Sequence, residues 1–275
     1  MQLVDVVDSL DKDFIKDHYF DEWSNRPDHI EAALTKNFMK HQMGLMFDFS
    51  EKIQQVYTST FASKQALKQI QGEDVLWFSH HAANWDIRKA PNVFTYLDEE
   101  SLQEMRRRRI SLYILHVPLD EDHMYGTSVC LGDELKLTKT DAFFNYRGAL
   151  AATLNESEDL DELIQRCKDV TGHDIGVYRN GVTRGRVTVV GGGGFDKEVL
   201  TGMKEQDSNI LVTGITANNK RNQELHAYCQ EHQIAVIGLS HYSSEKFACM
   251  KMVEYFQGLG LPAAFLAETP VLEDM

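Results

Sequence analysis

The stretch "KIQQVYTSTFASKQALKQIQGEDVLWFSHH", Lys52–His81, determines the expected fold. It is typical of an apolar strand, a turn of small residues, a helix, an acidic turn and a second apolar strand. The stretch "RVTVVGGGGFDKEVLTGMKEQDSNILVTGI", Arg186–Ile215, repeats this order element for element. A helix and a third apolar strand follow each copy, in "ISLYILHVPLD" (Ile110–Asp120) and "IAVIGLSHYSSE" (Ile234–Glu245). Short apolar strands that alternate with helices predict an α/β protein with largely parallel sheets.

The repeated order predicts two similar βαβ-containing lobes that arose by internal duplication. We expect lobe one to comprise residues 1–136 and 237–275, and lobe two to comprise residues 137–236. No long linker rich in proline or serine separates them, so the lobes should pack together. Residues 10–42 are expected to be helical, with Pro27 opening a second helix. The Arg-Asn-Gly turn in "DIGVYRNGVTRGRVTVV" predicts a β-hairpin.

The composition argues against a disordered, a membrane-spanning or a secreted protein. The 275 residues are 43% hydrophobic and 25% charged, as in ordinary globular proteins. No apolar run approaches the ~20 residues of a membrane helix, and the acidic start is unlike a signal peptide. The four cysteines form no CxxC pair, which indicates free thiols in a reducing compartment, the cytoplasm.

The net charge of −14 disfavours nucleic-acid binding, which depends on basic residues that neutralise phosphates. One basic run, "MRRRR" at Met105–Arg109, directly follows the acidic "LDEESLQE". We interpret it as the C-terminal end of a solvated helix, where positive charge is favourable, in preference to a phosphate-binding patch.

Residues that can bind metal ions collect at the expected strand ends, which is where ligand sites lie in open α/β sheets. His80 and His81 end the second strand of the first copy, and Asp120 ends its third strand. His241 ends the third strand of the second copy. Ser243 or Ser244 is expected to cap the following helix, so that Glu245 falls in its first turn and faces the same point as His241. The candidate ligands are therefore His80, His81, Asp120, His241 and Glu245.

Three imidazoles and two carboxylates without cysteine suit Zn, Mn, Fe or Ni. Adjacent histidines at a strand tip can reach two neighbouring ions with a bridging carboxylate, as in dinuclear centres. We therefore expect the metal site between the two lobes. Each feature also has an ordinary interpretation: the histidine pair as surface residues, Asp120 as a helix N-cap, and His241 with Glu245 as a surface pair.

The motifs "FSHHAANW", "LYILHVPLD", "GTSVCLGDELKL", "VTVVGGGGFD", "ILVTG" and "SHYSSEKFACMKMVEYF" follow one another along the chain. In these motifs and their order, over about residues 44–268, the chain resembles the Nif-three-like dinuclear metal-centre hexameric family, also named GTP cyclohydrolase 1 type 2 homologues. The resemblance implies that the same five residues bind two divalent ions. It also implies a homohexamer and a hydrolase that uses metal-activated water on a nucleotide, phosphoester or cyclic amidine. The alternative function is a metal-dependent binding or adaptor protein without turnover.

Departures from the family pattern concern three positions. Ala82 replaces the usual proline after the histidine pair, Ser240 replaces the usual glycine before "HY", and Ile215 replaces an acidic residue that often follows "TG". Ile215 removes one candidate for a general acid or base, which leaves Asp86 and His116. His116 is otherwise interpreted as a packed strand histidine. The run Gly191–Gly194 is interpreted as a tight turn, with binding of a substrate phosphate as the alternative.

Overall fold

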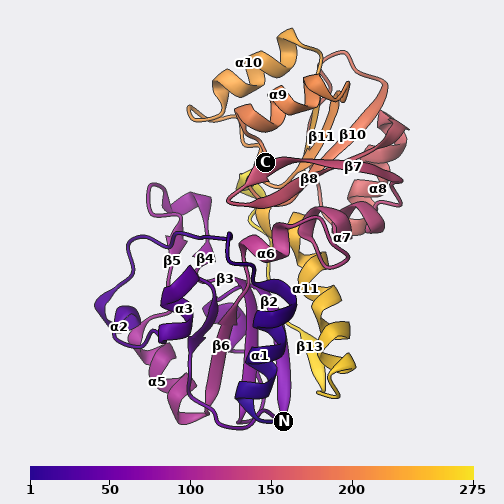
Figure 1. Cartoon of the computed structure of the whole chain (residues 1–275). Helices are drawn as coiled ribbons and strands as arrows, with labels where there is room; N and C mark the ends of the chain where they lie inside the picture. Colours follow the sequence, from indigo (N-terminus) through magenta and orange to yellow (C-terminus); the bar gives the residue numbers. More distant parts are fainter. The chain divides into compact units, whose positions relative to one another are not determined.

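The computed structural model describes all 275 residues (Figure 1). The chain divides into two compact units, one of residues 1–119 and 249–268, and one of residues 120–248 and 269–275. None of the helices combines the length and the apolar character that are needed to cross a membrane.

The first unit is built on a five-stranded sheet with the order β1-β6-β3-β2-β13. Neighbouring strands from β6 to β13 run parallel, and only β1 is antiparallel to its neighbour. A short antiparallel pair, β4 with β5, follows β3. The strands of this unit are β1 (Gly44–Phe47), β2 (Gln55–Phe61), β3 (Val75–His81), β4 (Asn84–Trp85), β5 (Phe94–Thr95), β6 (Ile110–Ile114) and β13 (Ala263–Phe265). Its helices are α1 (Leu3–Phe14), α2 (Asp28–Glu31), α3 (Lys36–His41), α4 (Lys64–Leu67), η1 (Ile87–Lys89) and α5 (Glu99–Arg107).

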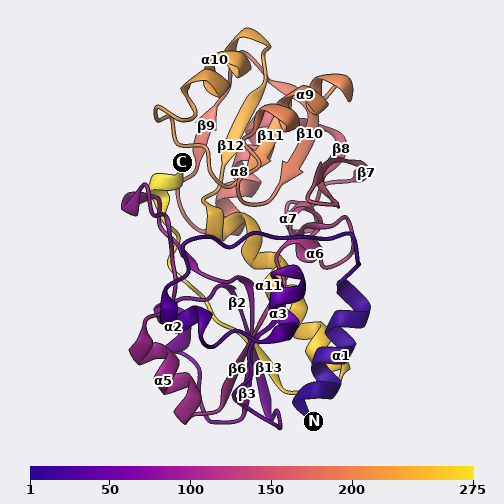
Figure 2. The ribbon, with the colours of Figure 1, turned by 60° about the vertical axis from the view of Figure 1, so that its left-hand side comes forward.

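Strand β3 is buried on both faces, which explains its unbroken apolar sequence. Trp77 lies in the core cluster that includes Leu102 and Met105 of α5. Phe78 points to the other face, where it stacks on Tyr113 with 6.2 Å between ring centroids. In Figure 2 this sheet is seen near its edge, with α5 on one side and with α1 and α11 on the other.

The basic run ends α5, as the sequence predicted. Asp98 caps the helix by accepting a hydrogen bond from the Ser101 N–H, and Arg106 and Arg107 lie in the last turn. The guanidinium of Arg108 donates to the Ile70 and Gly72 carbonyls. Arg109 forms ion pairs with Glu73 and Asp74. These partners within the unit favour the interpretation as a helix end.

The second unit has a six-stranded sheet with the order β7-β8-β10-β11-β12-β9. Strands β10, β11 and β12 are parallel, whereas the pairs at both edges are antiparallel. Figure 1 shows α9 and α10 on one face of this sheet and α7 and α8 on the other. The strands are β7 (Lys139–Tyr146), β8 (Ala149–Asp159), β9 (Gly176–Tyr178), β10 (Arg184–Val190), β11 (Ile210–Thr213) and β12 (Ala235–Gly238). The remaining helices are α6 (Val117–Asp120), α7 (Thr127–Glu134), α8 (Leu160–Thr171), α9 (Lys197–Glu205), α10 (Gln223–Glu231), α11 (His241–Gly258) and η2 (Leu272–Asp274).

The two sheets share a strand order. In the first, β2, β3 and β6 run parallel and are followed by the antiparallel β1. In the second, β10, β11 and β12 run parallel and are followed by the antiparallel β9. The α/β class is as expected, but only the first sheet is largely parallel, because three of the five pairings in the second sheet are antiparallel. The shared order accords with the internal duplication, which stays a prediction.

The boundaries between the two units differ from those expected between the two lobes. Residues 120–136 belong to the second unit because α7 packs on β8 and β10 of its sheet. The first residues of α11 also belong to it, because they contact the loop that follows β10. As a result Asp120, His241 and Glu245 all lie in the second unit, whereas His80 and His81 lie in the first.

Two local predictions differ from the structure. The Asn180-Gly181 turn has the positive φ angles of a hairpin turn, but β9 pairs with β12, and β10 pairs with β8 and β11. The helical prediction for residues 10–42 fails over residues 15–27, which are not helical. There Tyr19, Asp21 and Trp23 are buried while the residues between them are exposed, which is the alternation of an extended chain.

Candidate metal centre

His80 and His81 lie at the end of β3, beyond its last pairing with β6 at Ser79 and Ile114. Along the strand neighbouring side chains point to opposite faces, but these two rings converge, with 4.4 Å between their centroids. The exposed fractions are 0% for His80 and 2% for His81. Two adjacent imidazoles are therefore held together inside the protein at the carboxyl end of a parallel strand, which is where the sequence predicts a ligand site.

The orientation of His80 is fixed by the residue that follows β6. Its Nδ1 lies 3.0 Å from the Leu115 carbonyl oxygen. Because a carbonyl oxygen only accepts hydrogen bonds, Nδ1 must carry the proton, and the lone pair of the neutral ring is on Nε2. Metal-binding histidines in proteins are commonly oriented in this way.

Aromatic side chains surround His81. The Phe61 ring stacks on it with 4.9 Å between centroids and 23° between ring planes. Trp23 meets it edge-on at 6.0 Å. Both residues belong to the first unit; Phe61 covers one face of the imidazole and Trp23 borders it, and the ring is shielded from water.

His116 is a third imidazole of this group. Ring nitrogens of His80, His81 and His116 lie within 4.8 Å of one another. The Nδ1 of His116 is 2.8 Å from the Asp21 carboxylate. His116 was predicted to be a packed strand histidine or a candidate acid or base. Asp21 was not among the predicted site residues, because its segment was expected to be helical.

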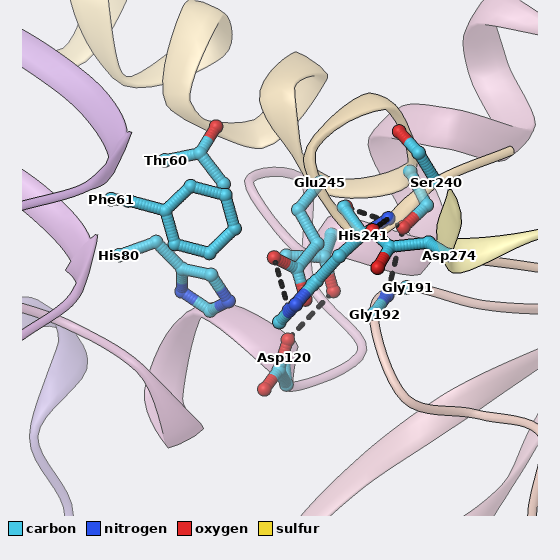
Figure 3. A network of polar contacts seen from close by, with 12 residues as sticks. Thr60, Phe61, His80, Asp120, Gly191, Gly192, Ser240, His241, Glu245 and Asp274 are labelled. Atoms are coloured by element: carbon cyan, nitrogen blue, oxygen red, sulfur yellow. Dashed lines mark hydrogen bonds and ion pairs between the residues drawn. The ribbon is translucent and has the colours of Figure 1, made fainter. Parts of the chain in front are cut away.

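His241 and Glu245 lie at the start of α11 in the second unit, and Figure 3 shows their side chains directed toward one another. The His241 Nε2 is 3.2 Å from the Glu245 carboxylate, and both side chains are nearly inaccessible. The helix begins earlier than predicted, because Ser240 is the cap and accepts a hydrogen bond from the Ser243 N–H at 3.2 Å. Glu245 is therefore one turn beyond His241, so that the two face the same side.

The glycine run approaches this pair closely. A Cβ atom on Gly192 would lie 2.1 Å from the Glu245 carboxylate and 3.2 Å from the His241 Nε2, and the residue has a φ of +61°. The Gly191 and Gly192 N–H groups donate to the Ser128 and Ser244 hydroxyls. These donors are used inside the unit, so the structure favours a tight turn over a phosphate cradle.

Asp120 (Figure 3) does not end the third strand as predicted, because β6 stops at Ile114 and the one-turn helix α6 follows, which Asp120 ends. Its carboxylate accepts a hydrogen bond from the Thr127 hydroxyl at 2.8 Å. The alternative that Asp120 is an N-cap does not hold for α7, because Gly126 occupies that position. Thr127 in turn borders Gly191, where an added Cβ would be 2.9 Å from the threonine oxygen. Thr127, which donates to Asp120, and Glu245 thus both border Gly191.

Asp86 has a local structural role. Its carboxylate caps η1 and forms two hydrogen bonds with the Arg88 guanidinium, at 2.7 and 3.0 Å. The Arg88 hydrogen bond holds the pKa of Asp86 below its usual value. An ionised carboxylate that already has these partners is a poor candidate for a general acid, which weakens one of the two remaining sequence candidates.

The donor chemistry in each unit fits a divalent metal ion. The first unit offers imidazole nitrogens, and the second offers one imidazole with the carboxylates of Asp120 and Glu245. Nitrogen and oxygen donors without thiolate are suited to Zn, Mn, Fe or Ni. The four cysteines of the chain are free and buried, and they play no part in these groups.

A sequence model of the family described as Duf34/NIF3 (NGG1p interacting factor 3) matches residues 29–270. The chain belongs to this family. A GTP cyclohydrolase 1 type 2 homolog from Borreliella burgdorferi is 26% identical over 236 residues, which cover 85% of this chain and 87% of the relative. A protein of the same name from Archaeoglobus fulgidus is 23% identical over 271 residues, covering 97% and 98%. The resemblance inferred from the motifs is therefore confirmed.

Solved structures share the fold of this Duf34/NIF3 protein. Protein ybgI, described as of unknown function, matches with a TM-score of 0.73 at 17% identity, covering 98% of this chain and 100% of that one. TTHA1606 from Thermus thermophilus matches with a TM-score of 0.69 at 22% identity, covering 98% and 99%. Likeness at these identities establishes the mixed α/β fold.

Proposed function

We propose that this Duf34/NIF3 protein binds two divalent ions through His80, His81, Asp120, His241 and Glu245, and that it is a metal-dependent hydrolase. The burial of the candidate ligands is the observation that carries the proposal. Three imidazoles and the Glu245 carboxylate are at most 4% exposed. Buried polar groups of this kind cost free energy of folding unless they are paired, hydrogen-bonded or bound to metal. Metal binding therefore explains why the chain keeps them in its interior.

Bound divalent ions would supply an electrophile and lower the pKa of a water molecule toward neutrality. The residues of the chain orient the metal ligands and shield them from water. Leu115 fixes the tautomer of His80 through its carbonyl, and the turn of α11 sets the spacing of His241 and Glu245. Phe61, which stacks on His81, and Trp23, which borders it, help to shield this ring from water.

For the substrate we propose a small molecule with a hydrolysable nucleotide, phosphoester or cyclic amidine group. The support is the name of the relatives, which are GTP cyclohydrolase 1 type 2 homologues. The second candidate is a metal-dependent binding or adaptor protein. It is favoured by the local pairing of Asp86, which leaves His116 as the remaining sequence candidate for a general acid or base.

Assembly and location complete the proposal. We propose a homohexamer, on the family resemblance alone, and light scattering of the 31.4 kDa chain would reveal it. We further propose that the protein acts in the cytoplasm, since its four cysteines are free.

The test is metal analysis of untagged protein. We expect about two ions per chain in the wild type and a loss in both His80→Ala and His241→Ala. His18→Ala is the matched control, because the His18 side chain is exposed whereas the candidate histidine ligands are buried. Unchanged metal content in both ligand variants would overturn the ligand assignment.

Turnover is tested separately with a panel of nucleotides, phosphoesters and cyclic amides. Activity is expected to disappear on chelation and to return when Mn or Zn is added. A protein that holds two ions and hydrolyses nothing in the panel would establish the binding or adaptor alternative.

A further inference from the structure

The segment of residues 15–27 reaches the imidazole group of the first unit. It lies before residues 29–270, the part of the chain that the family model matches. Trp23 donates its indole N–H to the Gln42 carbonyl at 3.0 Å, and its ring lies 5.2 Å from that of His116. Asp21 is 5% exposed. The segment is therefore anchored beside the candidate metal centre by its buried side chains.

Asp21 uses both carboxylate oxygens. One accepts a hydrogen bond from the Glu22 N–H at 2.8 Å, and the other lies 2.8 Å from His116 Nδ1. The side chain is 1% exposed, so little water competes for these contacts. Because a carboxylate only accepts, the proton of this contact is on His116 Nδ1, and a neutral His116 has its lone pair on Nε2.

The same arrangement holds His80, whose Nδ1 donates to the Leu115 carbonyl. The rings of His80 and His81 have their centroids 5.0 and 4.7 Å from that of His116. Two of the three imidazoles thus have Nδ1 bound to an oxygen acceptor, which leaves Nε2 as their donor atom. A carboxylate on the far nitrogen also makes an imidazole a stronger ligand.

We propose that Asp21 is a positioning residue, which holds His116 so that its Nε2 is an additional nitrogen donor of the metal centre. This inference rests on the proposed function, since it assumes that ions bind at His80 and His81. It assigns a role in metal binding to a segment that the family model does not include. His116 is the group that contacts the ion, and Asp21 acts through it.

The experiment measures Co²⁺ binding to full-length, metal-depleted protein, by affinity and by the visible absorption of the bound ion. Asp21→Asn keeps the size of the side chain and removes its charge, and we expect about a 10- to 100-fold loss of affinity. His116→Gln should lose at least as much, because it removes the ring donor while its amide can still donate to Asp21. Both variants should also change the Co²⁺ spectrum, which a merely structural pair would leave unaltered.

The matched control is Asp17→Asn, an exposed aspartate of the same segment. The double variant Asp21→Asn/His116→Gln should bind no more weakly than His116→Gln alone, because Asp21 acts through His116. Wild-type affinity and spectrum in His116→Gln, or an Asp21→Asn protein indistinguishable from the control, would overturn the inference while His80→Ala still loses metal. If His80→Ala also keeps its metal, the proposed function itself has failed.

Discussion

Gly192→Ala is expected to separate the stability of the fold from the integrity of the candidate metal centre. The added Cβ would lie 2.1 Å from the Glu245 Oε1 atom, where ordinary contacts begin at 3.4 Å. The carboxylate is the end of a flexible side chain, so it can retreat by more than about 1 Å at little cost in stability. Metal–ligand distances are held to about 0.2 Å, and such a displacement removes Glu245 from a bound ion.

The stability cost of the same change comes mainly from the backbone. Gly192 has a φ of +61°, a conformation that costs a residue with a side chain about 1–2 kcal/mol. We therefore expect a free energy of unfolding of the metal-free protein that is lower by about 1–2 kcal/mol. Metal affinity should fall by at least about 10-fold, as expected when a ligand is displaced.

Gly193→Ala is the matched control, because its Cβ would meet nothing within 4 Å and its φ is not in the left-handed region. Urea unfolding of the metal-free proteins gives the first quantity, and isothermal titration with Zn²⁺ gives the second. Equal zinc affinity in the two alanine variants would refute the reasoning, because it would mean that Glu245 need not occupy the position seen beside Gly192.

Two further predictions concern stability alone. Burial raises the pKa of Glu268 to about 7, against hydrogen bonds from the Phe61 N–H and the Ser63 hydroxyl that lower it. Between these pKa values the folded state holds a proton that the unfolded state releases. The free energy of unfolding should therefore fall as the pH rises from about 4.5 to 7, by an amount on the order of 3 kcal/mol. Glu268→Gln should remove this pH dependence, as measured by denaturant titrations at several pH values. Ser240 has a φ of +70° and caps α11. Because glycine relieves the positive φ, Ser240→Gly should be neutral or stabilise the fold by up to about 1 kcal/mol, whereas Ser240→Ala loses the cap and should destabilise it by about 1 kcal/mol. A higher melting temperature for Ser240→Ala than for Ser240→Gly would count against this account.

The sequence predicted those parts of the site that depend on local pattern. Strand ends are visible where an apolar run stops, so His80, His81 and the third strand of each copy could be located. The pair of His241 and Glu245 follows from helical spacing, although the start of the helix was placed too late because three serines compete as caps. The strand pairing of β9 could not be inferred, since a local turn does not determine which neighbour completes a sheet.

The contacts that hold the candidate ligands were beyond prediction for a different reason. Asp21 is 95 residues from His116, and Asp274 is 33 residues from His241. Asp21 lies in a segment that was expected to be helical, and Asp274 lies next to the last residue of the chain. In neither place does the sequence distinguish a buried carboxylate from the exposed one that is ordinary for aspartate. Only the tertiary structure shows that these two are buried and bound to histidine donors.

Asp274 lies in η2, four residues beyond the region matched by the family model, and is completely buried. Its carboxylate accepts the His241 N–H at 3.0 Å (Figure 3), and its carbonyl accepts the Thr216 and Ala217 N–H groups. Shortening a chain to the borders of its recognised family is routine in expression and crystallisation work. Here that truncation would remove Asp274, which accepts hydrogen bonds from three buried N–H groups, including that of the first residue of α11. A protein truncated in this way would therefore be unsuited to measurements of metal binding.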